Sequence, residues 1–400
     1  MVQELLMGNQ AIGMGAIRAG VRVVTGYPGT PSTEILETIA EVNPGQIYVE
    51  WSVNEKSALE VAAGAAYSGK RSMVTMKQVG LNVASDPLMS LAYIGVQGGM
   101  VVVVADDPGP ISSQTEQDTR QFGIFSKLPV FDPSSPEEAY LMIGDAFEYS
   151  EKYNTPVLFR PTTRVCHGCA SIDLDENSRI VKTEDNAVSK AEGFTKDSKW
   201  VIFPRLAYQN HLKIEARQPL LGEDFSTYRF NSVLGSGPKG IATGGISYAY
   251  TREVLEAKQT ECKLFKVATP HPFPEKLALE FLKGLDEVLV IEELDPVIEK
   301  ELLYLCGKHH LAVKVKGKLT QHMQNAGENT VESVAKAIAN FLEIPFTQAD
   351  LPEAVPALPA RPPVLCAGCP HRASFYAVKQ AMRGKKAVFS GDIGCYTWKW

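Results

Sequence analysis

Several features that would place a chain in a special class are missing from this sequence. Its strongest apolar run, at residues 100–105, is far too short to cross a bilayer. The opening MVQELLMGNQ lacks the basic and then apolar pattern of a secretory signal. Lys and Arg are spread along a chain of net charge −6, whereas nucleic acid is usually met by a clustered basic stripe. We therefore expect no membrane span and no nucleic-acid partner.

Cysteine is scarce as well, with an odd count of 7 in 400 residues. Without a secretory signal, this count indicates free thiols in a reducing cytoplasm rather than a disulfide framework. The rest of the composition, 44% hydrophobic and 22% charged, is that of a globular protein that can bury cores of normal size. A chain of 400 residues suits two or three domains.

The first part of the chain, residues 1–170, alternates short β-branched runs with helical patterns. This alternation implies a mostly parallel sheet with helices on both faces, the doubly wound α/β class. Strands are predicted at residues 21–25, 47–51, 72–76, 100–105 and 156–159. Three helices are predicted to start with an N-cap followed by proline, at Thr30-Pro31, Asp86-Pro87 and Ser135-Pro136.

Two further α/β segments follow a polar connection at residues 171–238, which holds one helix near 204–217. Residues 239–343 form a second, smaller unit of strands and helices in alternation. A proline-rich linker follows at 344–363, and residues 364–400 begin a third unit that is too short to close a core. The predicted elements are strands at 240–243, 263–267, 287–291 and 387–390, and helices at 247–257, 274–283, 297–306 and 371–382.

Two motifs of the first unit place residues suited to chemistry at a helix start. The turn at residues 27–34 holds glycine and two prolines, and the helix after it presents free N–H groups and hydroxyls that suit a carboxylate or phosphate. Glu55 follows Asn54 at the start of an alanine-rich helix at 55–68. Each motif also has a plain structural reading, as a well-capped turn and as a carboxylate that the helix dipole favours.

Four cysteines form two Cys-x-x-Cys pairs, a spacing used by zinc and iron–sulfur sites: Cys166, Cys169, Cys366 and Cys369. The two pairs lie about two hundred residues apart in different units, whereas compact metal sites draw on nearby loops. We therefore expect no metal site shared by these pairs. Cys369 and Cys395 are also candidates to line a cofactor pocket as small, weakly polar groups.

The order of these motifs resembles the large subunit of indolepyruvate ferredoxin oxidoreductase, in the family of thiamine-diphosphate-dependent 2-oxoacid:ferredoxin oxidoreductases. The likeness covers nearly the whole chain. It implies a pyrimidine-binding domain for the first unit, a transketolase C-terminal-like domain for the second and a diphosphate-binding domain for the third. It rests on residues 8–11, 26–32, 54–56, 76–82, 105–109, 112–114, 292–296, 365–372 and 391–397.

The resemblance also implies roles for single residues. The family's glutamate that hydrogen-bonds the pyrimidine ring falls on Glu55, with Gly29 also in the cofactor site, and its substrate-contacting threonine falls on Thr30. Arg120 is a weaker candidate for a charge partner of the substrate, with a solvated surface arginine as the alternative. The cofactor-pocket motifs of the third unit match Cys366, Gly368, Cys369, His371, Asp392, Gly394 and Cys395. No metal ligand is assigned within the chain.

The implied activity is the oxidative decarboxylation of aryl 2-oxoacids, such as indolepyruvate, with CoA. Its products are an aryl-acetyl-CoA and CO2, and its electrons pass to ferredoxin. The implied partners are a small β subunit and ferredoxin, in a cytoplasmic hetero-oligomer of amino-acid catabolism and electron transport. The preferred 2-oxoacid is left open.

Two motifs of the family are not found in residues 1–400. The Gly-Asp-Gly motif that holds Mg²⁺ against the diphosphate and the cysteine-rich segment for [4Fe-4S] clusters are both expected beyond residue 400. We therefore expect a truncated chain that is inactive when isolated. Two alternatives stay open, namely a non-catalytic interaction subunit and a non-oxidative thiamine-diphosphate decarboxylase.

Overall fold

The computed structural model describes residues 2–43, 45–174, 194–260, 262–346, 359 and 365–390. The chain divides into two compact units, Met1–Phe346 and Thr347–Trp400. Both α/β segments that were predicted before residue 344 therefore lie in one compact unit. Within the described ranges, no helix is long and apolar enough to span a membrane.

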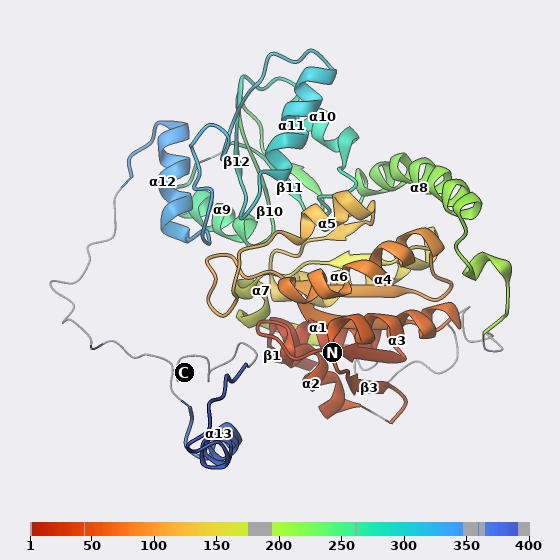
Figure 1. The fold of residues 1–400 in the computed structure, drawn as a ribbon. Helices are drawn as coiled ribbons and strands as arrows, with labels where there is room; N and C mark the ends of the chain where they lie inside the picture. Colours follow the sequence, from red (N-terminus) through yellow and green to blue (C-terminus); the bar gives the residue numbers. More distant parts are fainter. Residues whose placement is uncertain are drawn as a thin grey trace. The chain divides into compact units, whose positions relative to one another are not determined.

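A six-stranded parallel sheet forms the first half of the larger unit (Figure 1). Its strands, in spatial order, are β3 (Tyr48–Trp51), β2 (Val23–Gly26), β4 (Ser72–Lys77), β5 (Met100–Ala105), β7 (Val157–Phe159) and β6 (Val130–Phe131). Helices α1 (Gly8–Arg18), α2 (Thr33–Val42) and α6 (Pro136–Tyr153) cover one face, and α3 (Glu55–Tyr67) and α4 (Gln78–Ile94) cover the other. Strand β5 is apolar throughout because alternate valines enter the two separate cores.

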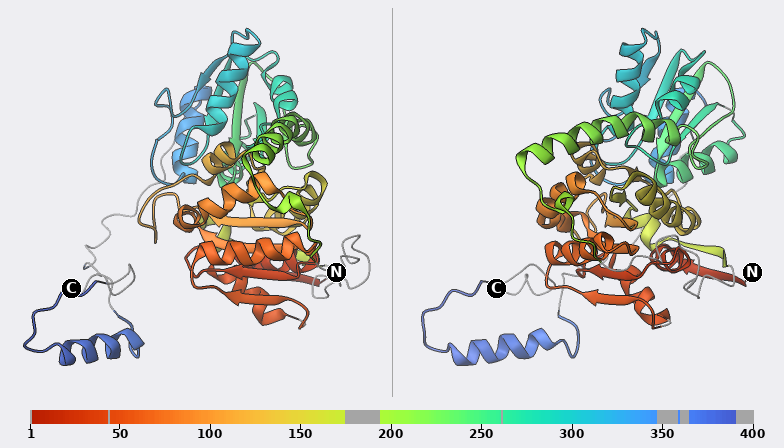
Figure 2. Two further views of the ribbon diagram at one scale, coloured as in Figure 1. Left: turned by 45° about the vertical axis from the view of Figure 1, so that its right-hand side comes forward. Right: turned by 90° about the vertical axis from the view of Figure 1, so that its right-hand side faces the viewer.

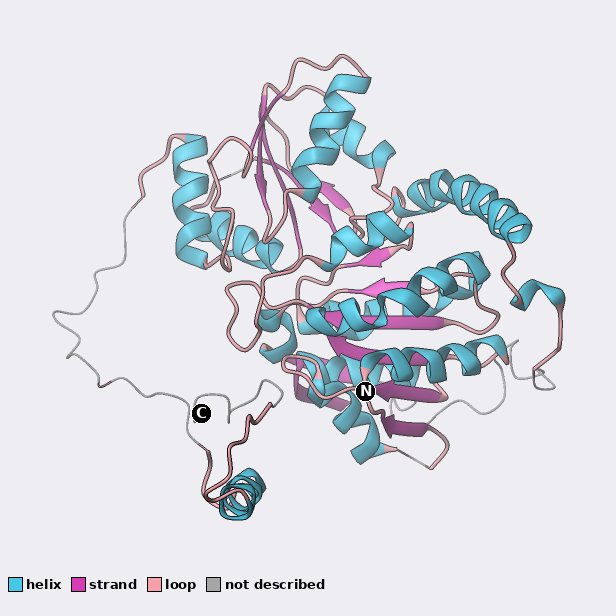
Figure 3. Ribbon diagram, viewed as in Figure 1, coloured by secondary structure: helices cyan, strands magenta, loops and turns pink. Residues whose placement is uncertain are grey.

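A five-stranded sheet forms the second half, and Figure 3 shows its strands apart from those of the first sheet. In spatial order these strands are β13 (Lys314–Lys316), β12 (Glu287–Ile291), β10 (Lys239–Gly244), β11 (Lys263–Val267) and β9 (Ser232–Leu234). The edge strand β9 is antiparallel to β11, and the other pairs are parallel. Helices α10 (Glu275–Leu282) and α11 (Val297–Lys308) cover one face, and α9 (Ile246–Ala257) and α12 (Val331–Leu342) cover the other.

Several elements join the two sheets. Helix α8 (Pro204–Phe225) contacts both α4 and α10, and Figure 2 shows it as a long green helix beside them. An isolated bridge between Val130 and His271 links the edge of the first sheet to the second half. The remaining elements are the antiparallel pair β1 (Val2–Met7) and β8 (Cys169–Leu174), the helices α5 (Thr119–Ser126) and α7 (Thr163–His167), and a 3-10 turn at Ser198–Trp200.

The α/β prediction is confirmed, and each strand predicted before residue 300 overlaps an observed one. Two predicted helix starts are wrong. The helix after Thr30 begins at Thr33, with Ser32 as its N-cap. Helix α4 begins at Gln78, so Pro87 lies inside it rather than at its start. The carbonyl that Pro87 leaves without a helical partner belongs to Val83, whose side chain is 49% exposed, so water can reach this turn.

The described part of the smaller unit contains helix α13 (Pro370–Ala381), in agreement with the predicted helix. None of the helix residues is buried. The predicted strand at 387–390 is wrong, because these residues are irregular and Val388 is 98% exposed. A strand needs a neighbour for its N–H and C=O groups, and among the described residues of this unit there is none.

Candidate active site

The carboxyl ends of β2, β4 and β5 meet at one edge of the six-stranded sheet. The strands are parallel and in register, so that Gly26 lies beside Thr75, and Lys77 lies beside Ala105. The turn after β2, the start of α4 and the loop after β5 therefore emerge together. This edge is where open α/β sheets place their ligands.

Asn9 of α1 anchors the turn that carries Thr30 by hydrogen bonds. The buried Asn9 amide donates to the Pro31 carbonyl at 2.6 Å and to the Glu34 carboxylate at 2.7 Å. Within the turn, Gly29 N–H donates to the Thr33 hydroxyl at 3.0 Å. Thr30 itself is exposed at the top of the turn. The sequence motif that begins at residue 8 thus supplies an anchor for the turn, which the residue-level predictions had missed.

Glu55 stands at the start of α3, which follows the edge strand β3. Asn54 caps this helix by accepting from the Ser57 N–H at 2.9 Å. The Glu55 side chain lies against Gly80 in the first turn of α4, where an added Cβ would be only 2.6 Å from the Glu55 Oε1 atom. The absence of a side chain at Gly80 is therefore what gives the Glu55 carboxyl its position.

The loop after β5 is fastened to the same edge by Asp107. Its carboxylate accepts from the N–H groups of Ile111 and Ser112 at 3.1 and 3.0 Å, and from the Thr163 hydroxyl at 2.7 Å. Burial alone would raise the pKa of Asp107, but these hydrogen bonds outweigh it and hold that pKa below its ordinary value. The loop then reaches Thr30, because the Ser112 hydroxyl donates to the Thr30 carbonyl at 3.2 Å.

A cavity of about 350 Å³ opens beside Thr30, within the size range of small-molecule sites. Arg164 lines it but is already bound to Glu328 through two 2.6 Å hydrogen bonds. His167 also lines it, with its Nε2 atom 3.7 Å from the Glu34 carboxylate. The full lining is Thr30, Ile111, Ser112, Thr163, Arg164, His167 and Gly168.

Arg120 lies away from solvent, with only 1% of its surface exposed. Its guanidinium donates to Asp118 at 2.7 and 2.9 Å, to Glu292 at 2.7 Å, and to the carbonyls of Glu293 and Asp295 at 2.6 and 2.9 Å. The alternative of a solvated surface arginine is wrong. Because Asp118 precedes α5 and Glu292 follows β12, Arg120 ties the two sheets together, and a substrate carboxylate would have to displace one of these partners.

Arg160 forms a second buried ion network nearby in the same interface. It donates to Asp106 at 2.7 Å and to Asp132 at 3.2 Å, and it is 2% exposed. Burial raises the pKa of Asp106 to about 6, although Arg160 opposes that rise. This network could not be predicted from local sequence patterns, because Asp106, Asp132 and Arg160 are far apart along the chain.

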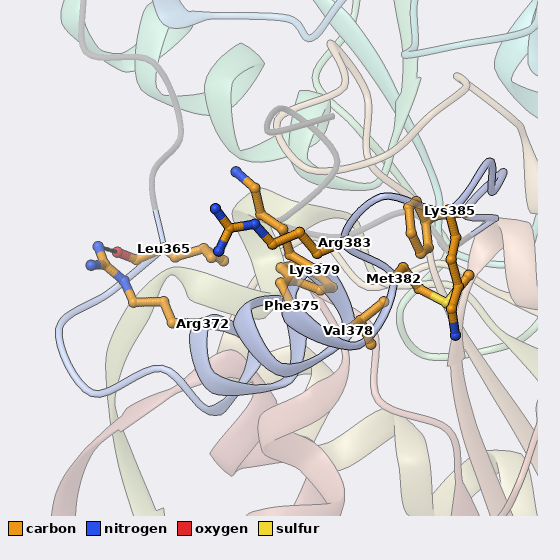
Figure 4. A pocket seen from close by; sticks show the side chains of 9 residues that line it. Leu365, Arg372, Phe375, Val378, Lys379, Met382, Arg383 and Lys385 are labelled. Carbon is orange, nitrogen blue, oxygen red and sulfur yellow. Dashed lines mark hydrogen bonds between the residues drawn. The ribbon is translucent and has the colours of Figure 1, made fainter.

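The predicted pocket residues of the smaller unit are only partly described. Cys369 Sγ lies 3.4 Å from His371 Nδ1, Cys366 is exposed, and Gly368 has a φ of +76°. Asp392, Gly394 and Cys395 lie outside the described residues. A hollow of about 700 Å³ runs along α13, and Figure 4 shows its basic and apolar side chains. Its lining among the described residues is Leu365, Arg372, Phe375, Val378, Lys379, Met382, Arg383, Lys385 and Phe389, which includes none of the described pocket candidates Cys366, Gly368, Cys369 and His371.

The other cysteine pair does not form a matched set of ligands. Cys166 is buried, and burial raises the pKa of its thiol well above the ordinary value, whereas Cys169 is exposed. In the part of the chain that the structure describes, no three His, Cys, Asp or Glu side chains are grouped to hold a metal ion.

In a Gly80→Ala variant the Glu55 carboxyl is expected to leave its present position, because the new methyl group would lie only 2.6 Å from the Glu55 Oε1 atom. The measurement is a crystal structure of the variant, with thermal unfolding as a check on the fold. Gly64→Ala on α3 is the control, since its Cβ would meet nothing within 4 Å. An unchanged Glu55 conformation in Gly80→Ala would show that Glu55 does not depend on this contact.

Comparison with known proteins gives a consistent result. The family model described as "Pyruvate flavodoxin/ferredoxin oxidoreductase, thiamine diP-bdg" matches residues 14–220. The chain is 41% identical to "Indolepyruvate oxidoreductase subunit IorA" of Methanothermobacter thermautotrophicus over 98% of the chain and 63% of that relative. The subunit of the same name from Thermococcus kodakarensis is also 41% identical, over 98% of the chain and 62% of the relative. The chain thus spans about three fifths of the length of these relatives.

More distant similarities mark the fold. The "2-oxoglutarate synthase subunit KorA" of Archaeoglobus fulgidus is 25% identical over 76% of the chain and 92% of that relative. Among solved structures, the 2-oxoglutarate:ferredoxin oxidoreductase from Magnetococcus marinus superimposes with a TM-score of 0.69 at 19% identity, covering 85% of this chain and 65% of that one. A split-gene transketolase superimposes with a TM-score of 0.54 at 15% identity, covering 85% and 99%.

Proposed function

Because the chain belongs to the thiamine-diphosphate-binding family of pyruvate flavodoxin/ferredoxin oxidoreductases, we propose that it works as a subunit of a 2-oxoacid:ferredoxin oxidoreductase. The finer proposal is that the enzyme converts aryl 2-oxoacids and CoA to aryl-acetyl-CoA and CO2. The observation that carries the first proposal is the Glu55 carboxyl, which lies against Gly80 at the carboxyl edge of the six-stranded sheet. The greater similarity to the indolepyruvate subunits than to the 2-oxoglutarate subunit supports the aryl substrate.

The residues at the edge of the sheet fit the aminopyrimidine half of the cofactor. Glu55 offers a carboxyl at a helix start, and Gly29, whose missing side chain leaves room for the Lys77 stem, would border the cofactor through its backbone. Thiamine diphosphate, when bound, would supply the nucleophilic carbon and the electron sink for decarboxylation. Glu55 would hold or release a proton at a pyrimidine nitrogen. The exposed Thr30 hydroxyl would donate to an oxygen of the substrate beside the 350 Å³ cavity.

The smaller unit is also proposed to bind the cofactor. There Cys366, Gly368, Cys369 and His371, with Asp392, Gly394 and Cys395, would border the cofactor. Mg²⁺ needs several oxygen ligands in near-octahedral geometry. These ligands, and the [4Fe-4S] clusters that pass electrons to ferredoxin, are proposed to come from outside residues 1–400. The small β subunit would be the partner in a cytoplasmic hetero-oligomer, and residues 1–400 alone would reduce no ferredoxin.

The test is oxoacid-dependent reduction of ferredoxin by the assembled enzyme with thiamine diphosphate, Mg²⁺ and CoA. We expect kcat/KM for indolepyruvate or phenylpyruvate to exceed that for 2-oxoglutarate by at least ~10²-fold, since a pocket shaped for one side chain discriminates by this order. A preference for 2-oxoglutarate would remove the aryl proposal. Release of CO2 and an aldehyde, without CoA consumption and without reduction of ferredoxin, would favour a non-oxidative decarboxylase.

A further inference from the structure

Lys77 is a half-buried cation at the candidate site, where the turn after β2, the start of α4 and the loop after β5 emerge together. It is the last residue of β4 and immediately precedes α4. The aliphatic part of its side chain packs against the Thr30 turn: a Cβ on Gly29 would be only 3.1 Å from the Lys77 Cδ atom. Its ammonium donates to the Ser112 carbonyl at 3.2 Å. Lys77 thus touches both the turn after β2 and the loop after β5.

The surroundings of this ammonium suit an anion that arrives from outside. Burial lowers the pKa of Lys77, and the negative charges of Asp107 and Glu55 oppose that effect. Yet among the described residues neither carboxylate comes within 4 Å of the ammonium to form an ion pair. An ammonium has three N–H donors, and the Ser112 carbonyl uses one of them. Two donors are left for a ligand.

The other cations near the Thr30 turn are already engaged. Arg164 lines the same cavity as Thr30, but its Nε and Nη2 atoms both donate to the Glu328 carboxylate. Arg120 is enclosed by Asp118, Glu292 and two carbonyls. The N-terminus of α4, a helix of 17 residues, adds its positive end next to Lys77. Lys77 contacts the Thr30 turn and Ser112 without lining that cavity, and it keeps N–H donors that a carboxylate bound at this turn could use.

We propose that Lys77 binds the carboxylate of the 2-oxoacid and so is a substrate-binding residue of this site. The proposal rests on the proposed function, which supplies the 2-oxoacid. The Thr30 hydroxyl and the Lys77 ammonium would contact the substrate from two sides, and the two groups would orient the bond to the carboxylate for cleavage. A charge-assisted hydrogen bond of this kind contributes about 10- to 100-fold to binding.

The experiment measures direct binding to the assembled enzyme, so that it does not depend on turnover. The probes are indole-3-propionate and its uncharged amide, indole-3-propionamide, titrated by calorimetry in the presence of thiamine diphosphate and Mg²⁺. In a Lys77→Met variant we expect the acid to bind about 10- to 100-fold more weakly, while the amide stays within about threefold of wild type. Lys77→Arg should restore most of the affinity for the acid, and KM for the oxoacid should follow the same pattern.

Lys56→Met is the matched control, because Lys56 lies next to Glu55 but pairs with the exposed Asp86 at 2.8 Å. If Lys77→Met weakened the binding of the acid and of the amide equally, Lys77 would only support the Ser112 loop, and the proposal would be overturned. An unchanged affinity for the acid would overturn it as well. The proposed function is tested by a different result: it would be wrong if the wild-type enzyme reduced no ferredoxin with any 2-oxoacid.

Discussion

A Glu55→Gln variant of the assembled enzyme is expected to turn over 2-oxoacid about 10²- to 10⁴-fold more slowly than wild type, the usual contribution of a general acid–base group. Glutamine keeps the size and the contact with Gly80 but cannot exchange a proton with the pyrimidine ring. The N-cap by Asn54 does not involve the Glu55 side chain, so the helix should keep its start. The measurement is kcat with saturating thiamine diphosphate, Mg²⁺ and CoA.

Glu60→Gln provides the control, because Glu60 is an exposed residue one and a half turns further along α3. It should leave kcat within about twofold, since an exposed carboxylate has little influence on a distant reaction in water. A Glu55→Gln enzyme that keeps more than about a tenth of the wild-type rate would speak against the assignment of Glu55.

An Arg120→Met variant is expected to lose about 3–5 kcal/mol of unfolding free energy, the usual cost of removing one member of a buried ion pair. Methionine fills much of the space but leaves the carboxylates of Asp118 and Glu292 without their cation. Both are as deeply buried as Arg120, with side chains 2% and 1% exposed. The lost contacts join the two sheets, so the interface between them should weaken most. Guanidinium denaturation of the chain gives the measurement.

The control for Arg120 is Arg229→Met. Arg229 also binds a carboxylate, Asp145 at 2.8 Å, but its side chain is 58% exposed. Exposed pairs contribute about 0–1 kcal/mol, so this variant should differ little from wild type. Equal denaturation midpoints for the two variants would mean that the buried network around Arg120 does not hold the sheets together.

The sequence allowed the elements of both sheets to be predicted because their signals are local. Strand β5 is a run of apolar residues, as a strand buried on both faces must be. Helix α6 begins at Pro136 after the Ser135 cap, as predicted, because Ser135 accepts from the Glu138 N–H at 3.3 Å. A cap of this kind needs only residues three apart in the chain.

Local signals failed where neighbours from elsewhere in the fold decided the outcome. Asp86-Pro87 has the composition of a helix start, yet α4 already begins at Gln78, and the buried row that includes Leu81, Ala84 and Leu88 keeps it helical across the proline. The residues at 387–390 have the composition of a strand but have no partner strand among the described residues. Pairing and packing, which propensity does not contain, settled both cases.

The sequence by itself determined the fold class, the strand order along the chain and the motifs that place Glu55 and Thr30 at helix starts. Only the tertiary structure decided which residues meet at those motifs. Gly80 contacts Glu55, and Lys77 packs against Gly29. Arg120 donates to Glu292 although 172 positions separate the two residues. The physical reason is that caps and periodicity depend on neighbours along the chain, whereas a parallel sheet brings distant strand ends together through its crossover helices.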